Sequence, residues 1–195
     1  LSYPSLIREV IAPLRAQAQS VLSDEIIRNI DCIYIYGSGD SLNAAVCAAQ
    51  SFWEYAGVPA YPLNAMQASR YAAPCLDRTR AARTLTICIS NSGETAEMKA
   101  TVAAVKANGC RIIGVTGHET SWLAQQSDVH LLAAVENEGG PLNRAPRMSI
   151  LAETVVLQAL SVLLQSDADV TPQQYVRWHP GGTLGQLRAN EKAEV

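Results

Sequence analysis

The chain has 195 residues, and 48% of them are hydrophobic, so it can bury a large core and does not fall in the disordered class. Its formal net charge of −3 excludes the strongly basic surfaces that attract nucleic acid or anionic membranes, and we expect neither as a partner. The most apolar run, 150–164, is interrupted by Glu153 and Gln158, so we expect no membrane-spanning helix.

Helix and strand patterns alternate along the chain. Residues 5–30 predict an N-terminal helical region that Pro13 kinks. Apolar periodicity then predicts helices at 41–55, 96–107 and 149–164. Short β-branched or apolar runs predict strands at 32–36, 85–89, 111–116 and 129–134, with a weaker fifth at 58–62.

The four stronger strand runs are apolar on both faces, which is typical of parallel strands covered by helices on both sides. Strands that alternate with helices imply right-handed crossover connections. We therefore predict an α/β fold, namely a three-layer αβα sandwich around a five-stranded parallel sheet. No internal repeat or linker divides the sequence, so residues 1–195 are expected to form a single domain.

The cysteines and histidines do not form a recognisable metal or disulfide pattern. The five cysteines include no C-x-x-C pair and no nearby cysteine–histidine cluster, so we expect free thiols, no metal and no cofactor. We expect structural roles for His118 and His130. Because the chain shows no charged leader pattern after Leu1 and its thiols are expected to be free, we predict a cytoplasmic protein.

Two turns that follow predicted strands are rich in glycine and hydroxyl residues. The first is Gly37-Ser-Gly-Asp-Ser41, and the second is Ser90-Asn-Ser-Gly-Glu-Thr95. In a parallel sheet these turns lie at the carboxyl ends of the strands, where ligands bind. The helix after the second turn offers free backbone N–H groups and the positive end of its dipole, and Gly93 permits close approach. Because this turn contains no lysine, the pattern favours a small phosphorylated molecule over a nucleoside triphosphate.

Other interpretations of these turns explain less. Helix capping accounts for one serine or threonine, but not for three hydroxyl groups and a second, similar turn. The G-K-[ST] triplet of nucleotide-binding loops is absent, and Leu42 occupies the third glycine position of the dinucleotide fingerprint. The residues around Ser92 do not form the G-x-S-x-G turn of hydrolases.

The two turns resemble the sugar isomerase (SIS) domain family, whose signature S-x-S-G-x-T is Ser90–Thr95 here. Within 175–188, Tyr175–Gly185 is similar to the His-Pro-Gly-Gly/Ala-x-Leu-Gly segment of arabinose-5-phosphate isomerases. The resemblance covers roughly residues 6–187 and implies a flavodoxin-like fold that binds phosphosugars. It implies a phosphate site at Ser41, Ser90, Asn91, Ser92, Gly93 and Thr95, and a sugar site at Gly37, Ser38, Gly39 and Asp40.

The resemblance also implies an assembly, and the sequence departs from the family at several positions. It implies that His179 approaches a sugar site, often that of a neighbouring subunit, so we expect a homodimer or homotetramer with a shared site. Many arabinose-5-phosphate isomerases carry a pair of CBS modules after this domain, and no such module is present up to Val195. Asp40 stands where those enzymes carry a lysine, and 63–71 contains no acid where they carry a glutamate or a His-Gly-Asp triplet.

Moving a carbonyl group between two sugar carbons requires a base and donors for the developing oxyanion. His179 is the first candidate because it titrates near neutral pH and precedes Pro180 and two glycines, although it could be a surface histidine. Glu153 is the second, because a carboxylate in an apolar helix tends towards a raised pKa. Glu153 could instead be a solvated residue or an ion-pair partner of Arg147. Glu97 also competes, but it better matches the helix dipole.

We therefore predict a phosphosugar aldose–ketose isomerase that acts through an enediol. The acid-free segment 63–71 favours an alternative, a non-catalytic phosphosugar sensor. A deaminase or lyase on the same fold is a third interpretation.

Overall fold

The computed structural model describes residues 30–73, 78–168 and 170–192. The predicted helical region 5–30 therefore lies outside the described residues, except for Ile30. Beyond it, the order of elements is β1 (Cys32–Gly37), α3 (Asp40–Ser51), the π-helical turn η1 (Phe52–Ala56), β2 (Ala60–Asn64), α4 (Ala65–Gln67), the π-helical turn η2 (Ala68–Ala72), α5 (Arg78–Ala81), β3 (Thr84–Ile89), α6 (Ala96–Ala107), β4 (Arg111–Thr116), α7 (Trp122–Gln126), β5 (Val129–Leu132), α8 (Met148–Asp167), α9 (Pro172–Trp178), and the 3₁₀ turns η3 (Thr183–Gly185) and η4 (Ala189–Glu191).

The five strands form one parallel sheet in the order β2-β1-β3-β4-β5, which confirms the predicted α/β class. Strand β3 is buried along its whole length, as expected for a central strand covered on both faces. The weak strand predicted at 58–62 begins two residues later, at Ala60. Gly57 there adopts a left-handed conformation that ends the preceding helix, so Val58 and Pro59 connect the two elements.

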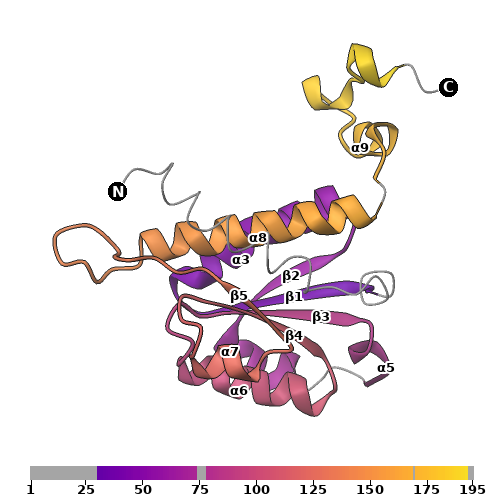
Figure 1. Ribbon diagram of the computed structural model, residues 1–195. Helices are drawn as coiled ribbons and strands as arrows, with labels where there is room; N and C mark the ends of the chain where they lie inside the picture. Colours follow the sequence, from indigo (N-terminus) through magenta and orange to yellow (C-terminus); the bar gives the residue numbers. More distant parts are fainter. Residues whose placement is uncertain (1–29, 74–77, 169, 193–195) are drawn as a thin grey trace.

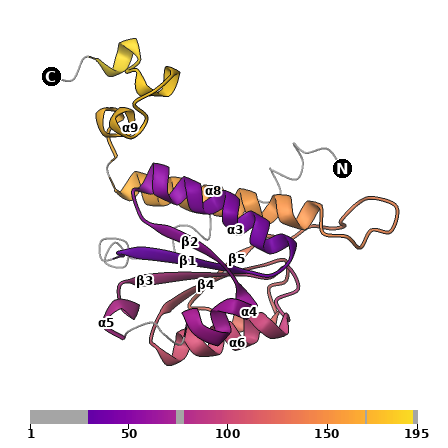
Figure 2. The same cartoon turned by 180° about the vertical axis from the view of Figure 1, so that it is seen from behind.

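Helices α3 and α8 cover one face of the sheet, while α6 and α7 cover the other (Figure 1 and Figure 2). The two apolar clusters on these faces form the core. Helix α3 ends at Ser51 and continues as the π-helical turn η1, so the helix predicted at 41–55 is interrupted in its last turn.

Helix α8 is longer than its apolar run indicated, because it extends from Met148 to Asp167. The window Met148–Gln165 is long and apolar enough to cross a membrane by length and composition alone, so the interruption of the apolar run by Glu153 and Gln158 does not make it too short, contrary to the argument from the sequence. Packing explains this composition, since α8 buries Ala152, Val156, Leu157 and Leu160 in the core beside α3 and the sheet.

The C-terminal segment 172–192 extends past the ends of α3 and α8, at the edge of the sheet where the strands begin (Figure 1). Its helix α9 and the turns η3 and η4 contain no buried residue. The long connection between β5 and α8 lies at the opposite edge, where the strands end (Figure 1).

Candidate functional site

The two turns singled out in the sequence lie side by side. Strands β1 and β3 pair in parallel, with Tyr36 opposite Cys88, so the turns that follow them start at the same edge. The first turn is tight: a Cβ atom on Gly37 would lie 2.8 Å from the backbone nitrogen of Leu42. Gly39 has a φ of 55°, a conformation that favours glycine. These two glycines let α3 begin directly after the strand.

The hydroxyl groups of Ser90–Thr95, hereafter the anion loop, converge on one another. Ser90 is 4% exposed, and its Oγ lies 2.8 Å from Thr95 Oγ1 and 3.5 Å from Ser92 Oγ. The backbone N–H of Gly93, whose φ is 66°, donates to Ser90 Oγ at 3.1 Å. Thr95 is the N-cap residue of α6, but its side chain makes no capping hydrogen bond. Capping of α6 therefore does not account for the Thr95 hydroxyl, whereas Ser92 Oγ accepts the backbone N–H of Glu94 at 3.2 Å within the loop.

Glu153 connects the first turn to α8. Its side chain is 0% exposed, and Ser41 Oγ donates to Glu153 Oε1 at 3.1 Å. Burial raises the pKa of Glu153 to about 7, against the opposing effect of the Ser41 hydrogen bond, and the charges of Glu138 and Asp40 raise it further. The solvated-residue interpretation was therefore wrong. The bonded partner of Glu153 is Ser41 rather than Arg147, which is exposed.

Buried polar atoms without partners gather in this region. Among the described residues, they are Ser38 Oγ, Ser149 Oγ and Glu153 Oε2. Ser38 belongs to the first turn, whereas Ser149 and Glu153 are one helical turn apart at the start of α8. Because buried polar atoms are usually hydrogen-bonded, these atoms at one edge are open to a bond with a polar ligand or with water.

Glu138, which the sequence pattern does not reveal, holds the start of α8. Its Oε2 accepts from the backbone N–H of Arg147 at 2.7 Å and of Ser149 at 3.1 Å. Burial would raise the pKa of Glu138, but the backbone N–H of Arg147, the hydroxyl and backbone N–H of Ser149 and the backbone N–H of Met148 outweigh burial and hold its pKa below the ordinary value. No local signal could reveal this cap, since the acid precedes the helix by ten residues and the intervening loop brings it back.

His179 lies at the opposite edge of the sheet from the anion loop. Its Nε2 is 2.8 Å from Glu54 Oε1, in the π-helical turn after α3, and its Nδ1 is 2.9 Å from the carbonyl oxygen of Tyr175. The backbone bond to Tyr175 and the bond to Glu54 raise the pKa of His179. The chain therefore brings Ser41, Glu153 and the anion loop together, but not its own His179.

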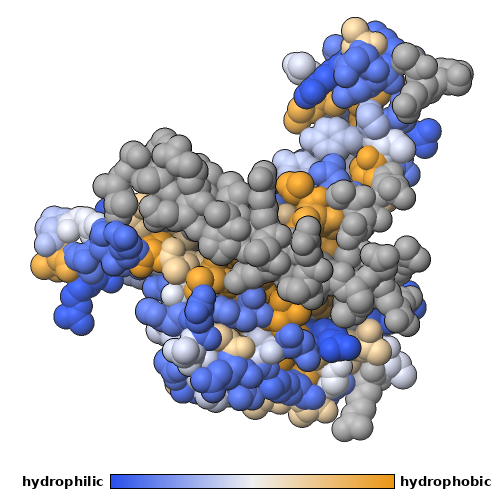
Figure 3. All heavy atoms as spheres, viewed as in Figure 1, coloured by the Kyte–Doolittle hydropathy of each residue, from blue (hydrophilic) through white to orange (hydrophobic). Residues whose placement is uncertain are grey.

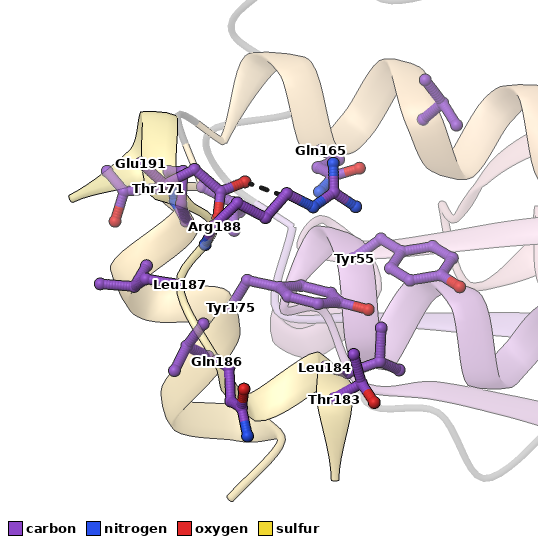
Figure 4. A pocket seen from close by; sticks show the side chains of 14 residues that line it. Tyr55, Gln165, Thr171, Tyr175, Thr183, Leu184, Gln186, Leu187, Arg188 and Glu191 are labelled. Carbon is purple, nitrogen blue, oxygen red and sulfur yellow. Dashed lines mark hydrogen bonds and ion pairs between the residues drawn. The ribbon is translucent and has the colours of Figure 1, made fainter. Parts of the chain in front are cut away.

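A groove of about 580 Å³ lies beside that second edge, between the C-terminal segment and the end of α8. Tyr55 and Tyr175 lie along it with ring centroids 6.3 Å apart, and Arg188 pairs with Glu191 at its rim (Figure 4). The groove is separate from the anion loop.

The remaining candidates are exposed or structural. Asp40 is exposed at the start of α3, and Glu97 is half-buried in the first turn of α6. His130 Nε2 lies 2.9 Å from Thr116 Oγ1. The described part of the chain contains no group of three or more acids, cysteines or histidines that could hold a metal ion.

Comparison with known proteins adds to this geometry. A model of the SIS domain family matches residues 26–163. The arabinose 5-phosphate isomerase KdsD of Escherichia coli K12 is 39% identical over 108 residues, or 54% of this chain and 33% of that protein. KpsF of Escherichia coli, also an arabinose 5-phosphate isomerase, is 36% identical over 111 residues, or 57% of this chain and 35% of that protein. The matches thus span about a third of these relatives.

Two solved structures show the similarity in three dimensions. A protein of E. coli CFT073 in complex with arabinose 5-phosphate superposes with a TM-score of 0.77 at 27% identity, over 90% of each chain. The C-terminal domain of glucosamine-fructose-6-phosphate aminotransferase from Francisella tularensis has a TM-score of 0.66 at 20% identity, over 90% of this chain and 51% of that one. Because the second structure is only 20% identical to this chain, it supports the fold alone.

Proposed function

The chain belongs to the SIS domain family, and on this premise we propose that it is a phosphosugar isomerase that moves a carbonyl group between C1 and C2 of its substrate. The names of KdsD and KpsF and the arabinose 5-phosphate bound by the E. coli CFT073 protein support a sugar phosphate as the substrate class. No redox change is needed, because aldose and ketose are isomers.

The anion loop holds the phosphate in this proposal. Ser90 Oγ already lies 2.8 Å from Thr95 Oγ1 and 3.5 Å from Ser92 Oγ. The N-terminus of α6 adds backbone N–H groups and a favourable dipole. Ser41 and Asn91 lie beside them in the same two turns. A grip on the phosphate, remote from the reacting carbons, orients C1 and C2.

The buried carboxyl of Glu153 is the observation that carries the proposal. A pKa of about 7 lets Glu153 accept and return a proton near neutral pH. Glu153 takes the proton from C2 of the aldose, leaving an enediolate, and returns it to C1 while a proton moves between the two oxygens. Its unpartnered Oε2 is the accepting atom, and Gly37–Asp40 line the sugar beside it.

His179 enters from a second copy of the chain. Within one chain it lies against Glu54 at the far edge of the sheet, so a role at the sugar requires a neighbouring subunit. The exposed apolar residues Val162, Leu163 and Trp178 support such an assembly. In Figure 3, hydrophobic spheres are visible where α8 leads into the C-terminal segment. A homodimer or homotetramer with shared sites would cover this surface.

The test is proton exchange at C2 of arabinose 5-phosphate in deuterated water, followed by NMR. We expect exchange with the natural chain and at least a hundredfold slower exchange with Glu153→Gln, which keeps the shape but cannot take up a proton. Stabilisation against heat by arabinose 5-phosphate should persist in Glu153→Gln. Stabilisation without exchange in the natural chain would instead show a phosphosugar sensor.

A further inference from the structure

Glu94 is the one acid within the anion loop, which is an unexpected residue for a loop that binds phosphate. Like charges a few ångströms apart repel each other, so a carboxylate directed at the ligand would weaken binding. The structure shows that Glu94 is directed elsewhere. Its Oε1 accepts the backbone N–H of Trp122 at 2.8 Å, and its Oε2 lies 2.6 Å from Lys99 Nζ.

These contacts attach the anion loop to the first turn of α7. Trp122 is the first residue of α7, after the N-cap Ser121, so its backbone N–H has no acceptor within that helix. Glu94 supplies the acceptor from 28 residues away. The next N–H, that of Leu123, donates to the carbonyl oxygen of Gly93 at 3.0 Å. Two successive N–H groups of α7 thus hold two successive residues of the loop.

The surfaces of the two segments fit closely. A Cβ atom on Gly93 would lie 2.3 Å from Ser121 Oγ, so glycine lets the loop rest directly on the start of α7. On the other side of Gly93, the backbone N–H of Gly117 donates to the carbonyl oxygen of Asn91 at 2.9 Å. The backbone N–H of Ser90 also donates to the carbonyl oxygen of Val115 in β4 at 3.0 Å, so the loop is held from Ser90 to Glu94 by β4, α7 and the turn between them.

We infer that Glu94 is a positioning residue, which fixes the conformation of the phosphate-binding hydroxyl groups through its hydrogen bond to the backbone of Trp122. This inference rests on the proposed phosphate site. The bond to Lys99 and the N–H of Trp122 also hold the pKa of Glu94 below its ordinary value, so the carboxylate remains ionised and an acceptor at neutral pH. Lys99 neutralises the charge and lies 5.5 Å from the centroid of the Trp122 ring.

Variants of Glu94 and Lys99 separate the hydrogen bond from the charge. Glu94→Ala removes both contacts of the carboxylate, and Glu94→Gln keeps an oxygen for the Trp122 N–H. Lys99→Met removes the ion pair and the cation near the Trp122 ring but leaves the bond from the Trp122 N–H to Glu94 in place. We expect the dissociation constants for inorganic phosphate and arabinose 5-phosphate to rise roughly five- to tenfold in Glu94→Ala. They should change less than about twofold in Glu94→Gln and Lys99→Met. In C2 exchange, Glu94→Ala should raise KM by a larger factor than it lowers kcat.

A second pair of variants tests the backbone donor itself. Trp122→Pro deletes the N–H at a position where helices tolerate proline, and Ser121 before it is already extended, with φ −64° and ψ 158°. Trp122→Ala keeps the N–H and removes the same ring, so it is the matched control. Trp122→Pro should weaken phosphate binding as Glu94→Ala does, relative to Trp122→Ala. Combining Glu94→Ala with Trp122→Pro should add little further loss.

The binding measurements, made by calorimetry, distinguish the possible failures. Glu94→Ala binding as tightly as the natural chain would overturn the inference, and so would Glu94→Gln binding as weakly as Glu94→Ala. If the natural chain itself bound neither probe, the proposed phosphate site would fail and the positioning role with it. Melting temperatures without ligand show whether each variant is folded.

Discussion

Replacing Glu153 by glutamine should change how stability depends on pH. The ordinary pKa of glutamate is 4.5, and burial raises that of Glu153 to about 7 in the folded chain. The folded state therefore holds this proton at pH values where the unfolded state has lost it. The stabilising contribution is complete below about pH 4.5 and is lost as the pH rises through about 7.

The size of the effect follows from the two pKa values. Their separation is about 2.5 pH units, which at about 1.4 kcal/mol per unit corresponds to about 3 kcal/mol. Glutamine imitates the protonated carboxyl, since its oxygen can still accept from Ser41 Oγ and it carries no charge. Relative to the natural chain, Glu153→Gln should therefore gain about 2–3 kcal/mol of unfolding free energy between about pH 5 and pH 8.

Urea unfolding followed by tryptophan fluorescence measures this difference, at one protein concentration so that assembly is constant. The other titrating groups act equally on both proteins, and the difference isolates Glu153. A constant difference between about pH 5 and pH 8 would refute the reasoning, because it would mean that Glu153 is ionised in the folded chain at both values.

Two further predictions concern the loop and the assembly. Ser90→Ala combined with Ser92→Ala should weaken arabinose 5-phosphate binding by at least tenfold, because in a loop without lysine the neutral hydroxyl groups hold the phosphate. Unchanged thermal stabilisation by arabinose 5-phosphate would show that the phosphate binds elsewhere. Mixing inactive Glu153→Gln and His179→Ala proteins, after dissociation and reassembly, should restore about a quarter of the exchange activity if a dimer shares its sites. No recovery would place His179 outside the partner's site.

Much of the fold could be predicted because its signals are local. The strand at 111–116 and the helix at 96–107 were found with their observed bounds, since apolar runs and the stop signal at Asn108-Gly109 lie within the segments themselves. The anion loop was equally visible, because all its residues are consecutive. The π-helical turn Phe52–Ala56 was not, because the apolar pattern of 41–55 does not distinguish it from a continued α-helix.

The sequence by itself determined the layers, the parallel sheet and the hydroxyl-rich turn at the end of a strand, because short-range periodicity and turn chemistry suffice for these. Only the tertiary structure decided the surroundings of each charged side chain. Ser41 meets Glu153 across 112 residues, and His179 meets Glu54 across 125. Such contacts form because the sheet brings distant turns to one edge, and a carboxyl group acquires its pKa from these neighbours and its burial rather than from the residues beside it in the chain.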